Sequence, residues 1–375
     1  MELFDVYPLY DVTPVSAKGI VVTDDKGQDY MDFYGGHAVI SIGHSHPHYV
    51  ERLKGQLDKI GFYSNAVQNP IQKTLARKLG ELSGCMDYNL FLCNSGAEAN
   101  ENALKLASFQ TGKSRVIAFK QGFHGRTSAA VAATDNEKIN APLNKQQKVS
   151  ILAFEDLKAF KGELTNGDVC AVIIETIQGV GGLEQPSQEF YSNIAALCKE
   201  NNVVLIADEV QCGYGRSGKF FAFQHYGIQP DIITVAKGMG NGFPIGGVLI
   251  HESIKASYGL LGTTFGGNHL ACAAGLAVLE VLEKENLIEN SAQLFNYFKE
   301  KAASIPQVKR VKGMGLMLGL EFDFEVAELR KKLIHNQHMF TGGASDKHVL
   351  RVLPALNITK EHLDQFFDAL EEELA

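Results

Sequence analysis

The sequence lacks any hydrophobic run approaching the ~18 residues of a membrane-spanning helix, and its first residues form neither a basic start nor an apolar signal core. We therefore expect a cytoplasmic protein with no membrane partner. A basic excess is also missing: 35 Lys and Arg stand against 43 Asp and Glu, a formal net charge of -8. Because nucleic-acid surfaces need cations to displace counterions, we expect small-molecule partners and no nucleic acid.

Cysteine and histidine patterns give no sign of a metal site. The cysteines at 85, 93, 170, 198, 212 and 272 include no Cys-x-x-Cys pair and no disulfide framework, so we expect reduced thiols. His44, His46 and His48 alternate and would share one side of an extended segment. Pro47 disfavours a regular strand there, and no cysteine or carboxylate lies close by in sequence. We therefore predict no metal.

The chain length of 375 residues, at roughly 150 residues per domain, predicts two domains. Residues 20–33 have the pattern of a β-hairpin around a turn at 24–27. From about residue 50, helical periods such as 71–82 and 98–110 alternate with short β-branched runs, which is typical of an α/β domain. Helices at 270–282, 291–304 and 360–374 and a Gly-rich strand pair at 313–321 follow. We predict a large domain over 50–255 and a smaller α+β domain from 1–49 and 256–375.

Three almost wholly apolar strands, at 169–174, 203–207 and 232–236, are followed or ended by Glu175, Asp208 and Lys237. Continuous apolar strands separated by helices indicate a parallel sheet covered on both faces. In such sheets ligands bind outside the carboxyl ends of the strands. Asp208 and Lys237 are therefore the first catalytic candidates.

Residues 92–100, Leu-Cys-Asn-Ser-Gly-Ala-Glu-Ala-Asn, run from an apolar strand through a Ser-Gly turn into a helix. Free backbone N–H groups and the helix dipole make such a junction suitable for a phosphate. Ordinary capping by Asn94 or Ser95, with Glu98 and Glu101 in the first turn, is the alternative explanation.

Asp208 and Lys237 have chemistry that suits a pyridine cofactor. A carboxylate buried at a strand end needs a cationic partner, which a protonated pyridine nitrogen would supply while Val210, on the same face, packs on the ring. A salt bridge to Arg216 is the alternative. Lys237 precedes glycines at 238, 240 and 242 and has the position of a lysine with a depressed pKa that forms Schiff bases.

Five segments together resemble one family: 94–100, Phe-His-Gly-Arg at 123–126, Asp-Glu-Val-Gln at 208–211, Ala-Lys-Gly at 236–238, and Gly-Thr-Thr-Phe-Gly-Gly-Asn at 262–268. The chain resembles the class III pyridoxal-phosphate-dependent aminotransferases from about residue 6 to its end, most of all those acting on acetylornithine or succinylornithine. The resemblance implies the aspartate-aminotransferase-like fold, with a large, mostly parallel seven-stranded sheet domain and a smaller α+β domain.

The resemblance also implies roles for individual residues. Lys237 would bind pyridoxal 5'-phosphate covalently and then act as the base that moves a proton, while Asp208 would keep the pyridine nitrogen protonated. Further cofactor contacts would come from Ser95, Gly96, Ala97, Phe123, Val210, Gln211 and Thr264. Thr264 would reach the phosphate from the partner subunit, so we expect a homodimer with shared active sites. Substrate would contact Arg126, Thr263 and Arg351.

The function implied is transfer of the δ-amino group of an N-acylornithine to 2-oxoglutarate, giving glutamate, in arginine biosynthesis. Other ω-amino donors, namely ornithine, N-succinyl-diaminopimelate and 4-aminobutyrate, remain alternatives, as does an aminomutase. A non-enzymatic binding protein would have no reason to keep Lys237.

The sequence departs from the family at Val180, where the family usually has glutamate, and at His37, where it tends to have an aliphatic residue. In related ω-aminotransferases that glutamate neutralises the arginine matching Arg351. Two explanations stay open: a donor that carries its own extra carboxylate, such as N-succinylornithine, or compensation by a chloride, a water cluster or another acidic residue.

Overall fold

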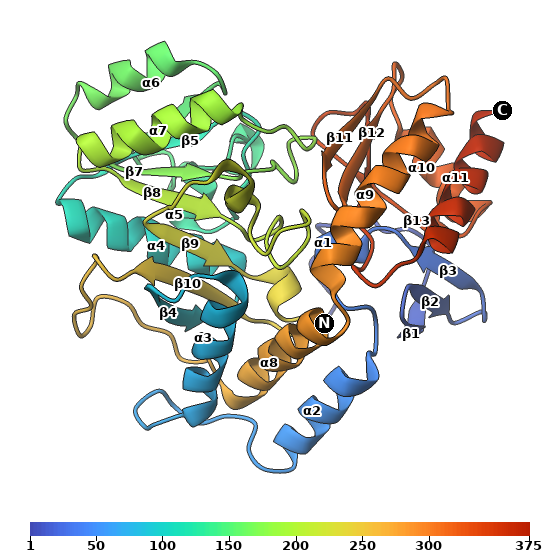
Figure 1. Cartoon of the computed structure of the whole chain (residues 1–375), viewed down its shortest axis with the longest axis horizontal. Coiled ribbons are helices and arrows are strands. Elements are labelled where there is room, and N and C mark those ends of the chain that lie inside the picture. Colours follow the sequence, from blue (N-terminus) through green and yellow to red (C-terminus); the bar gives the residue numbers. More distant parts are fainter.

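The computed structural model describes every residue from Met1 to Ala375 and is built around a seven-stranded sheet (Figure 1). The sheet order is β4-β10-β9-β8-β7-β5-β6. Strands β5 to β9 are parallel to one another, and β10 is antiparallel to both β9 and β4. The bounds are Tyr88–Cys93 (β4), Arg115–Phe119 (β5), Val149–Leu152 (β6), Val169–Ile174 (β7), Val204–Asp208 (β8), Ile232–Val235 (β9) and Gly246–His251 (β10). The predicted α/β class with a mostly parallel large sheet is confirmed.

The central strands are apolar throughout because both faces of the sheet are covered. Along β7, Val172 belongs to one buried cluster and Ile173 to another, and Leu205 and Ile206 of β8 divide in the same way. The helices of this region are α3 (Pro70–Ser83), α4 (Gly96–Thr111), α5 (Ser128–Ala132), α6 (Leu157–Leu164) and α7 (Gln188–Glu200), and α4 packs across β7 to β10. No helix of the structure has the length and apolar character needed to cross a membrane.

Two four-stranded sheets form the rest of the β-structure. The first has the order β1-β2-β3-β13 and the second β11-β12-β15-β14. Their strands are Pro14–Lys18 (β1), Val21–Asp24 (β2), Asp29–Asp32 (β3), Arg310–Met314 (β11), Met317–Glu321 (β12), Met339–Phe340 (β13), Gly342–Gly343 (β14) and Val349–Val352 (β15). Since β3 pairs with β13, the N-terminal hairpin joins the C-terminal part of the chain, as Figure 1 shows. This pairing agrees with the proposed division at residues 50 and 255, which stays a prediction.

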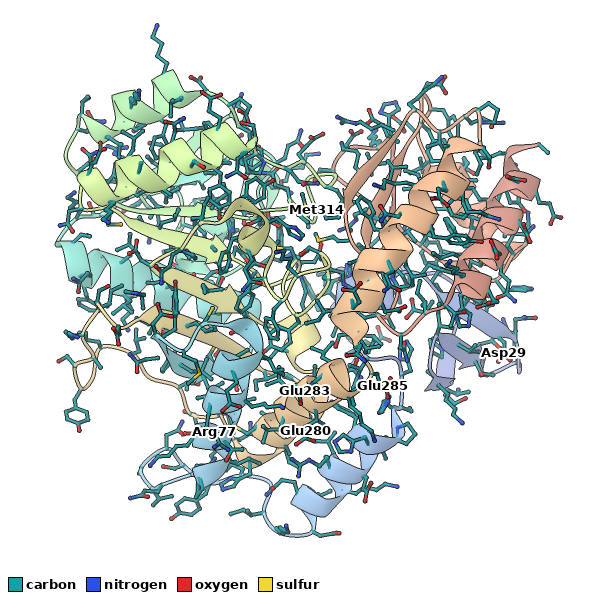
Figure 2. The ribbon with its side chains drawn as sticks, in the orientation of Figure 1. Asp29, Arg77, Glu280, Glu283, Glu285 and Met314 are labelled. Atoms are coloured by element: carbon teal, nitrogen blue, oxygen red, sulfur yellow. The ribbon has the colours of Figure 1, made fainter.

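The remaining helices are α1 (Gly35–Ala38), α2 (Pro47–Leu57), α8 (His269–Lys284), α9 (Leu287–Ala303), α10 (Ala327–His335) and α11 (Lys360–Leu374). The mostly buried α8 supports both α2 and α3. Its acidic residues Glu280, Glu283 and Glu285 lie along the end of α8 near α2 and α3 (Figure 2).

The alternating histidines contact three separate carboxylates. His44 pairs with Asp32 at 2.8 Å, and Pro47 begins a helix rather than interrupting a strand. His46 pairs with Glu285 at 2.9 Å and His48 with Glu280 at 2.5 Å, which attaches α2 to α8. The six cysteines are buried and unpaired.

Candidate active site

A cavity of about 370 Å³ opens at the carboxyl ends of the central strands. Glu175, Asp208 and Lys237, which follow or end β7, β8 and β9, all line it. The three strands are neighbours in the sheet, so the predicted convergence of their terminal side chains is confirmed. Of the residues proposed from the sequence, the cavity is lined by Ser95, Gly96, Ala97, Phe123, Arg126, Asp208, Val210, Gln211 and Lys237.

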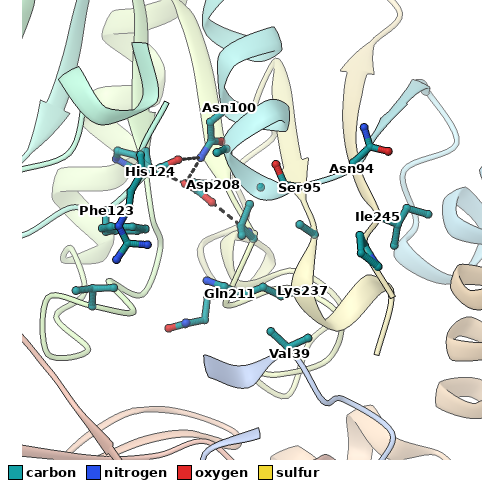
Figure 3. Close-up of a pocket in the computed structure, with 18 of the residues that line it drawn as sticks. Val39, Asn94, Ser95, Asn100, Phe123, His124, Asp208, Gln211, Lys237 and Ile245 are labelled. Carbon is teal, nitrogen blue, oxygen red and sulfur yellow. Dashed lines mark hydrogen bonds and ion pairs between the residues drawn. The ribbon is translucent and has the colours of Figure 1, made fainter. Parts of the chain in front are cut away.

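Asp208 is the centre of a buried hydrogen-bond network (Figure 3). Its Oδ2 accepts from Asn100 Nδ2 at 2.8 Å and from His124 Nδ1 at 2.7 Å, and its Oδ1 accepts from the Val210 N–H at 3.1 Å. Asn100 is oriented in turn by Thr234, whose hydroxyl donates to its Oδ1 at 2.7 Å. The Asp208 carboxylate is therefore held in one orientation from three sides.

Among the ionisable side chains, His124 is the hydrogen-bonding partner of Asp208. Burial disfavours the charged imidazolium, but the hydrogen bond to Asp208 and its charge outweigh burial, so the pKa of His124 is raised. The alternative partner, Arg216, is wrong: its guanidinium donates to the carbonyl oxygens of Leu316, Pro354 and Ile40. Carbonyl groups are available to Arg216 because it lies where several loops meet, away from the end of β8.

Lys237 begins a short 3₁₀ turn, Lys237–Met239, directly after β9. Its φ of 44° lies in the left-handed region, which costs a residue with a side chain about 1–2 kcal/mol. A lysine kept in a conformation that suits glycine indicates that its amino group is needed there. Burial lowers the pKa of Lys237, and the nearby Asp208 and Glu175 charges only partly oppose that shift.

The start of α4 forms another wall of the cavity. Ser95 is the N-cap, and its hydroxyl accepts from the Glu98 N–H at 3.2 Å. The first N–H groups of the helix have no partner within it, so Gly96 and Ala97 can still donate to an anion. Capping and anion binding are thus compatible. Gly96 allows close approach, because a Cβ there would lie 2.6 Å from Val210 Cγ1.

Phe123 and Arg126 lie on the loop after β5. The Phe123 N–H donates to Glu175 Oε1 at 2.8 Å, and the Arg126 guanidinium lies 5.3 Å from the Phe123 ring centroid. Glu101 of α4 fixes the end of this loop by accepting from the Thr127 hydroxyl and the Ala130 N–H, both at 2.9 Å. Arg126 itself is exposed and available to a ligand.

Gln211 reaches the cavity from the segment after β8, close to Lys237 (Figure 3). Its Nε2 donates to the His37 carbonyl at 3.1 Å, and its buried Oε1 has no partner. Glycine lies opposite it without displacing Gln211, because a Cβ on Gly179 would lie 1.9 Å from that Oε1.

Arg351, on β15, is buried just outside the cavity and is 4% exposed. Its Nε donates to the Gly343 carbonyl and its Nη1 to the Gly179 carbonyl, both at 2.6 Å, and its guanidinium lies 5.8 Å from the Tyr34 ring centroid. No carboxylate pairs with it. Val180, next to Gly179, lines the cavity and offers only an apolar side chain.

The two threonines lie differently from the other predicted residues. Thr263 Oγ1 accepts from the side chain of the cavity residue Asn94 at 3.3 Å and from the Gly266 N–H at 3.1 Å. Thr264 is exposed and outside the cavity of its own chain.

Sequence reasoning missed three polar members of this site. Asn100 and His124 stand inside the segments that carried the family resemblance, but their contact with Asp208 joins positions far apart in the chain. Glu175 was recognised as a strand-end charge and given no role. Asn100 could have been found by its helical position, one turn after Gly96 on the same helix face.

The family model of the class-III aminotransferases matches residues 6–374. The chain belongs to the class-III aminotransferases. It is 41% identical to the acetylornithine aminotransferase of Bacillus subtilis, covering 100% of this chain and 98% of that protein. It is also 41% identical to the acetylornithine aminotransferase of Methanocaldococcus jannaschii, covering 98% of this chain and 94% of that protein.

Two solved transaminase structures have the same fold. An ornithine aminotransferase from Toxoplasma gondii, whose active site holds PLP at partial occupancy, superposes with a TM-score of 0.89 at 28% identity, covering 97% of this chain and 90% of that one. An S-selective transaminase from Arthrobacter superposes with a TM-score of 0.90 at 24% identity, covering 100% and 95%. The family, together with the PLP in the Toxoplasma gondii enzyme, implies a pyridoxal-phosphate cofactor.

Proposed function

We propose that this class-III aminotransferase moves the δ-amino group of an N-acylornithine to 2-oxoglutarate. The proposal rests on one combined observation. The chain is 41% identical to an acetylornithine aminotransferase over its full length, and its cavity contains Lys237, Asp208 and Arg126 and lies beside Arg351. Two arginines suit a dicarboxylate acceptor, because each guanidinium can bind one carboxylate through two hydrogen bonds.

The residues of the cavity fit pyridoxal 5'-phosphate. Lys237 has the lowered pKa of an amine ready to bond a carbonyl carbon, and the free N–H groups at the start of α4 suit a phosphate. Asp208 offers a carboxylate for a protonated ring nitrogen, and the unpartnered Oε1 of Gln211 marks a polar position with room for a ligand. When bound, the cofactor supplies an electron sink for the reacting substrate carbon.

Each side chain has one task in this proposal. Asp208, held by Asn100 and His124, would keep a proton on the ring nitrogen, and Phe123 and Val210 would hold the ring between them. Lys237 would hold the cofactor, and its amino group would move the proton at the substrate carbon.

The substrate side is divided between the two arginines. Arg126 binds the carboxylate far from the reacting carbon, and Arg351 binds the carboxylate attached to that carbon in glutamate or 2-oxoglutarate. Both assignments rest on the family resemblance and on the place of Arg126 in the same cavity as Lys237.

We further propose a homodimer with shared active sites. Phe62 and Phe265 are 43% and 60% exposed, and their ring centroids are only 5.4 Å apart, so they form an apolar surface beside Thr264. A second copy would cover this surface and bring its Thr264 to the phosphate position. Light scattering after size exclusion measures the mass. Mixing Lys237→Ala, which we expect to be inactive, with Thr264→Val, which we expect to bind the cofactor more weakly, tests whether one site with full cofactor affinity appears.

A donor panel tests the function. Acetyl-, succinyl- and free ornithine, N-succinyl-diaminopimelate and 4-aminobutyrate are each assayed with 2-oxoglutarate, and we expect an N-acylornithine to have the highest kcat/KM. Free ornithine is the second candidate, because the structural neighbours include an ornithine aminotransferase. Turnover that continues without 2-oxoglutarate would identify an aminomutase instead.

A further inference from the structure

The positive charge of Arg351 has no substrate carboxylate to pair with while an ω-amino donor is bound. An ω-amino donor has no carboxylate on its reacting carbon, so it leaves Arg351 without a substrate anion. A buried cation without compensation is unfavourable, and it also repels the donor's ammonium group. Val180 cannot supply the missing negative charge.

Glu175 is the carboxylate connected to Arg351. Its Oε2 accepts from the Gly179 N–H at 2.9 Å, and the carbonyl of the same Gly179 accepts from Arg351 Nη1 at 2.6 Å. Glu175 is 6% exposed, so little solvent screens its charge. Glu175 therefore holds the N–H of the same residue whose carbonyl accepts from Arg351, and its negative charge acts on Arg351.

This connection is held by several contacts. A Cβ at position 179 would lie 1.9 Å from Gln211 Oε1, so any other residue there would have to displace the end of the Gln211 side chain. The second carboxylate oxygen of Glu175 accepts from the Phe123 N–H at 2.8 Å, so both oxygens are fixed by backbone donors. The carboxylate cannot turn away from the Gly179 segment without losing a hydrogen bond.

We propose that Glu175 is the positioning residue that compensates the charge of Arg351, acting through Gly179, and so admits an ω-amino donor that carries no carboxylate on its reacting carbon. This inference rests on the proposed function and specifies the substrate class for the same site. It favours compensation by an acidic residue of the chain over a donor with an additional carboxylate.

The compensation depends on pH. Burial raises the pKa of Glu175 to about 7, with Asp208 adding to the rise and His124 and the backbone donors opposing it. The ionisable groups that face Glu175 are His124, Asp208, Cys212, Lys237 and Arg351. Above this pKa the carboxylate compensates Arg351; below it Glu175 is neutral, and the positive charge acts fully on the substrate.

The first test is Glu175→Gln, which keeps the shape of the side chain and removes its charge. We expect KM for N-acetylornithine to rise about tenfold, while KM for 2-oxoglutarate stays level or falls, because the loss of one charge interaction of about 1.4 kcal/mol changes binding by that factor. Glu184→Gln, on the same segment but paired with Arg310 and Lys312, is the matched control and should change neither constant. Equal increases for donor and acceptor would overturn the proposal.

A double variant tests compensation directly. Val180→Glu introduces a carboxylate one residue from Gly179, so Glu175→Gln combined with Val180→Glu should recover most of the lost donor affinity. If the double variant binds N-acetylornithine no better than Glu175→Gln alone, charge compensation is wrong.

Binding of 2-oxoglutarate to the resting holoenzyme, measured by calorimetry, needs no turnover and no assumption about the donor. We expect wild type to bind 2-oxoglutarate several-fold more tightly at about pH 6 than at about pH 8, because Glu175 becomes neutral as the pH falls. Glu175→Gln should show much less of this change. An identical pH response in the two proteins would refute the role of Glu175, even if no N-acylornithine proves to be a substrate.

Discussion

Asp208→Asn separates the chemical role of the carboxylate from its structural role. Asp208 is 3% exposed and accepts hydrogen bonds from Asn100 and His124, at 2.8 and 2.7 Å. An asparagine can keep its oxygen toward these two donors. Its NH₂ group would then face the Val210 N–H, which now donates to Asp208 Oδ1 at 3.1 Å, so two donors would oppose each other. We expect the fold to survive and the charge to be lost.

The magnitudes follow from these contacts. Loss of a hydrogen bond to a charged group costs about 1.5–3 kcal/mol, which corresponds to a decrease of a few degrees in Tm for a chain of this size. A neutral amide also fails to hold the ring nitrogen protonated. Removing one partner of a buried ion pair costs about 3–5 kcal/mol, so we expect kcat to fall by roughly 10²–10⁴-fold.

Steady-state kinetics on samples with verified cofactor content measure the effect. Glu209→Gln is the matched control: Glu209 is the next residue, is 1% exposed, and accepts from the backbone N–H groups of Ala222 and Phe223 instead of facing the cavity. The control should lose stability with little change in kcat. If Asp208→Asn retained kcat close to the wild-type value with cofactor bound, the role assigned to this carboxylate would be wrong.

Three further predictions concern other parts of the molecule. Lys237→Ala should lose turnover by at least ~10³-fold, because covalent attachment and the proton-transferring base disappear together, and borohydride reduction of wild type should place the pyridoxyl label on Lys237 and on no other lysine. Thr264→Val should weaken cofactor binding by about 1.5–3 kcal/mol in a verified dimer, and unchanged affinity would contradict a shared site. Burial raises the pKa of Glu209 from its ordinary 4.5 to about 7, so the folded state binds more protons between these values, and unfolding free energy should fall as pH rises through this window. Glu209→Gln should remove up to about 1.4 kcal/mol per pH unit from that slope, as measured by chemical denaturation.

The carboxyl-end site was predictable because its signals are local. A fully apolar strand indicates that both of its faces are covered, so β7, β8 and β9 could each be recognised from its own residues. Parallel strands end at one edge of a sheet, and this rule alone places Asp208 and Lys237 close together. The start of α4 could also be predicted from the sequence, because the N-cap Ser95 and the glycine after it determine where the helical backbone begins.

The partner of Asp208 was not predictable in the same way. Arg216 is near in sequence and has the right charge, but its segment turns away and finds backbone carbonyls. His124 follows another strand, β5, which is separated from β8 in the sheet only by β7. This packing brings His124 Nδ1 to 2.7 Å from Asp208 Oδ2. Ion-pair partners in a buried site depend on which loops meet there, and sequence separation carries no information about that.

The sequence by itself predicted the fold class, the family and the strand-end residues that line the cavity, because strand pattern, turn glycines and strand-end charges are properties of short segments. Only the tertiary structure decided how the charges are compensated. Arg351 and Glu175 are far apart in the chain and both hydrogen-bond to the single residue Gly179, where a Cβ would displace the end of the Gln211 side chain. The energy of a buried charge depends on distances of a few ångströms and on the exclusion of water, and both are settled only when distant segments pack together.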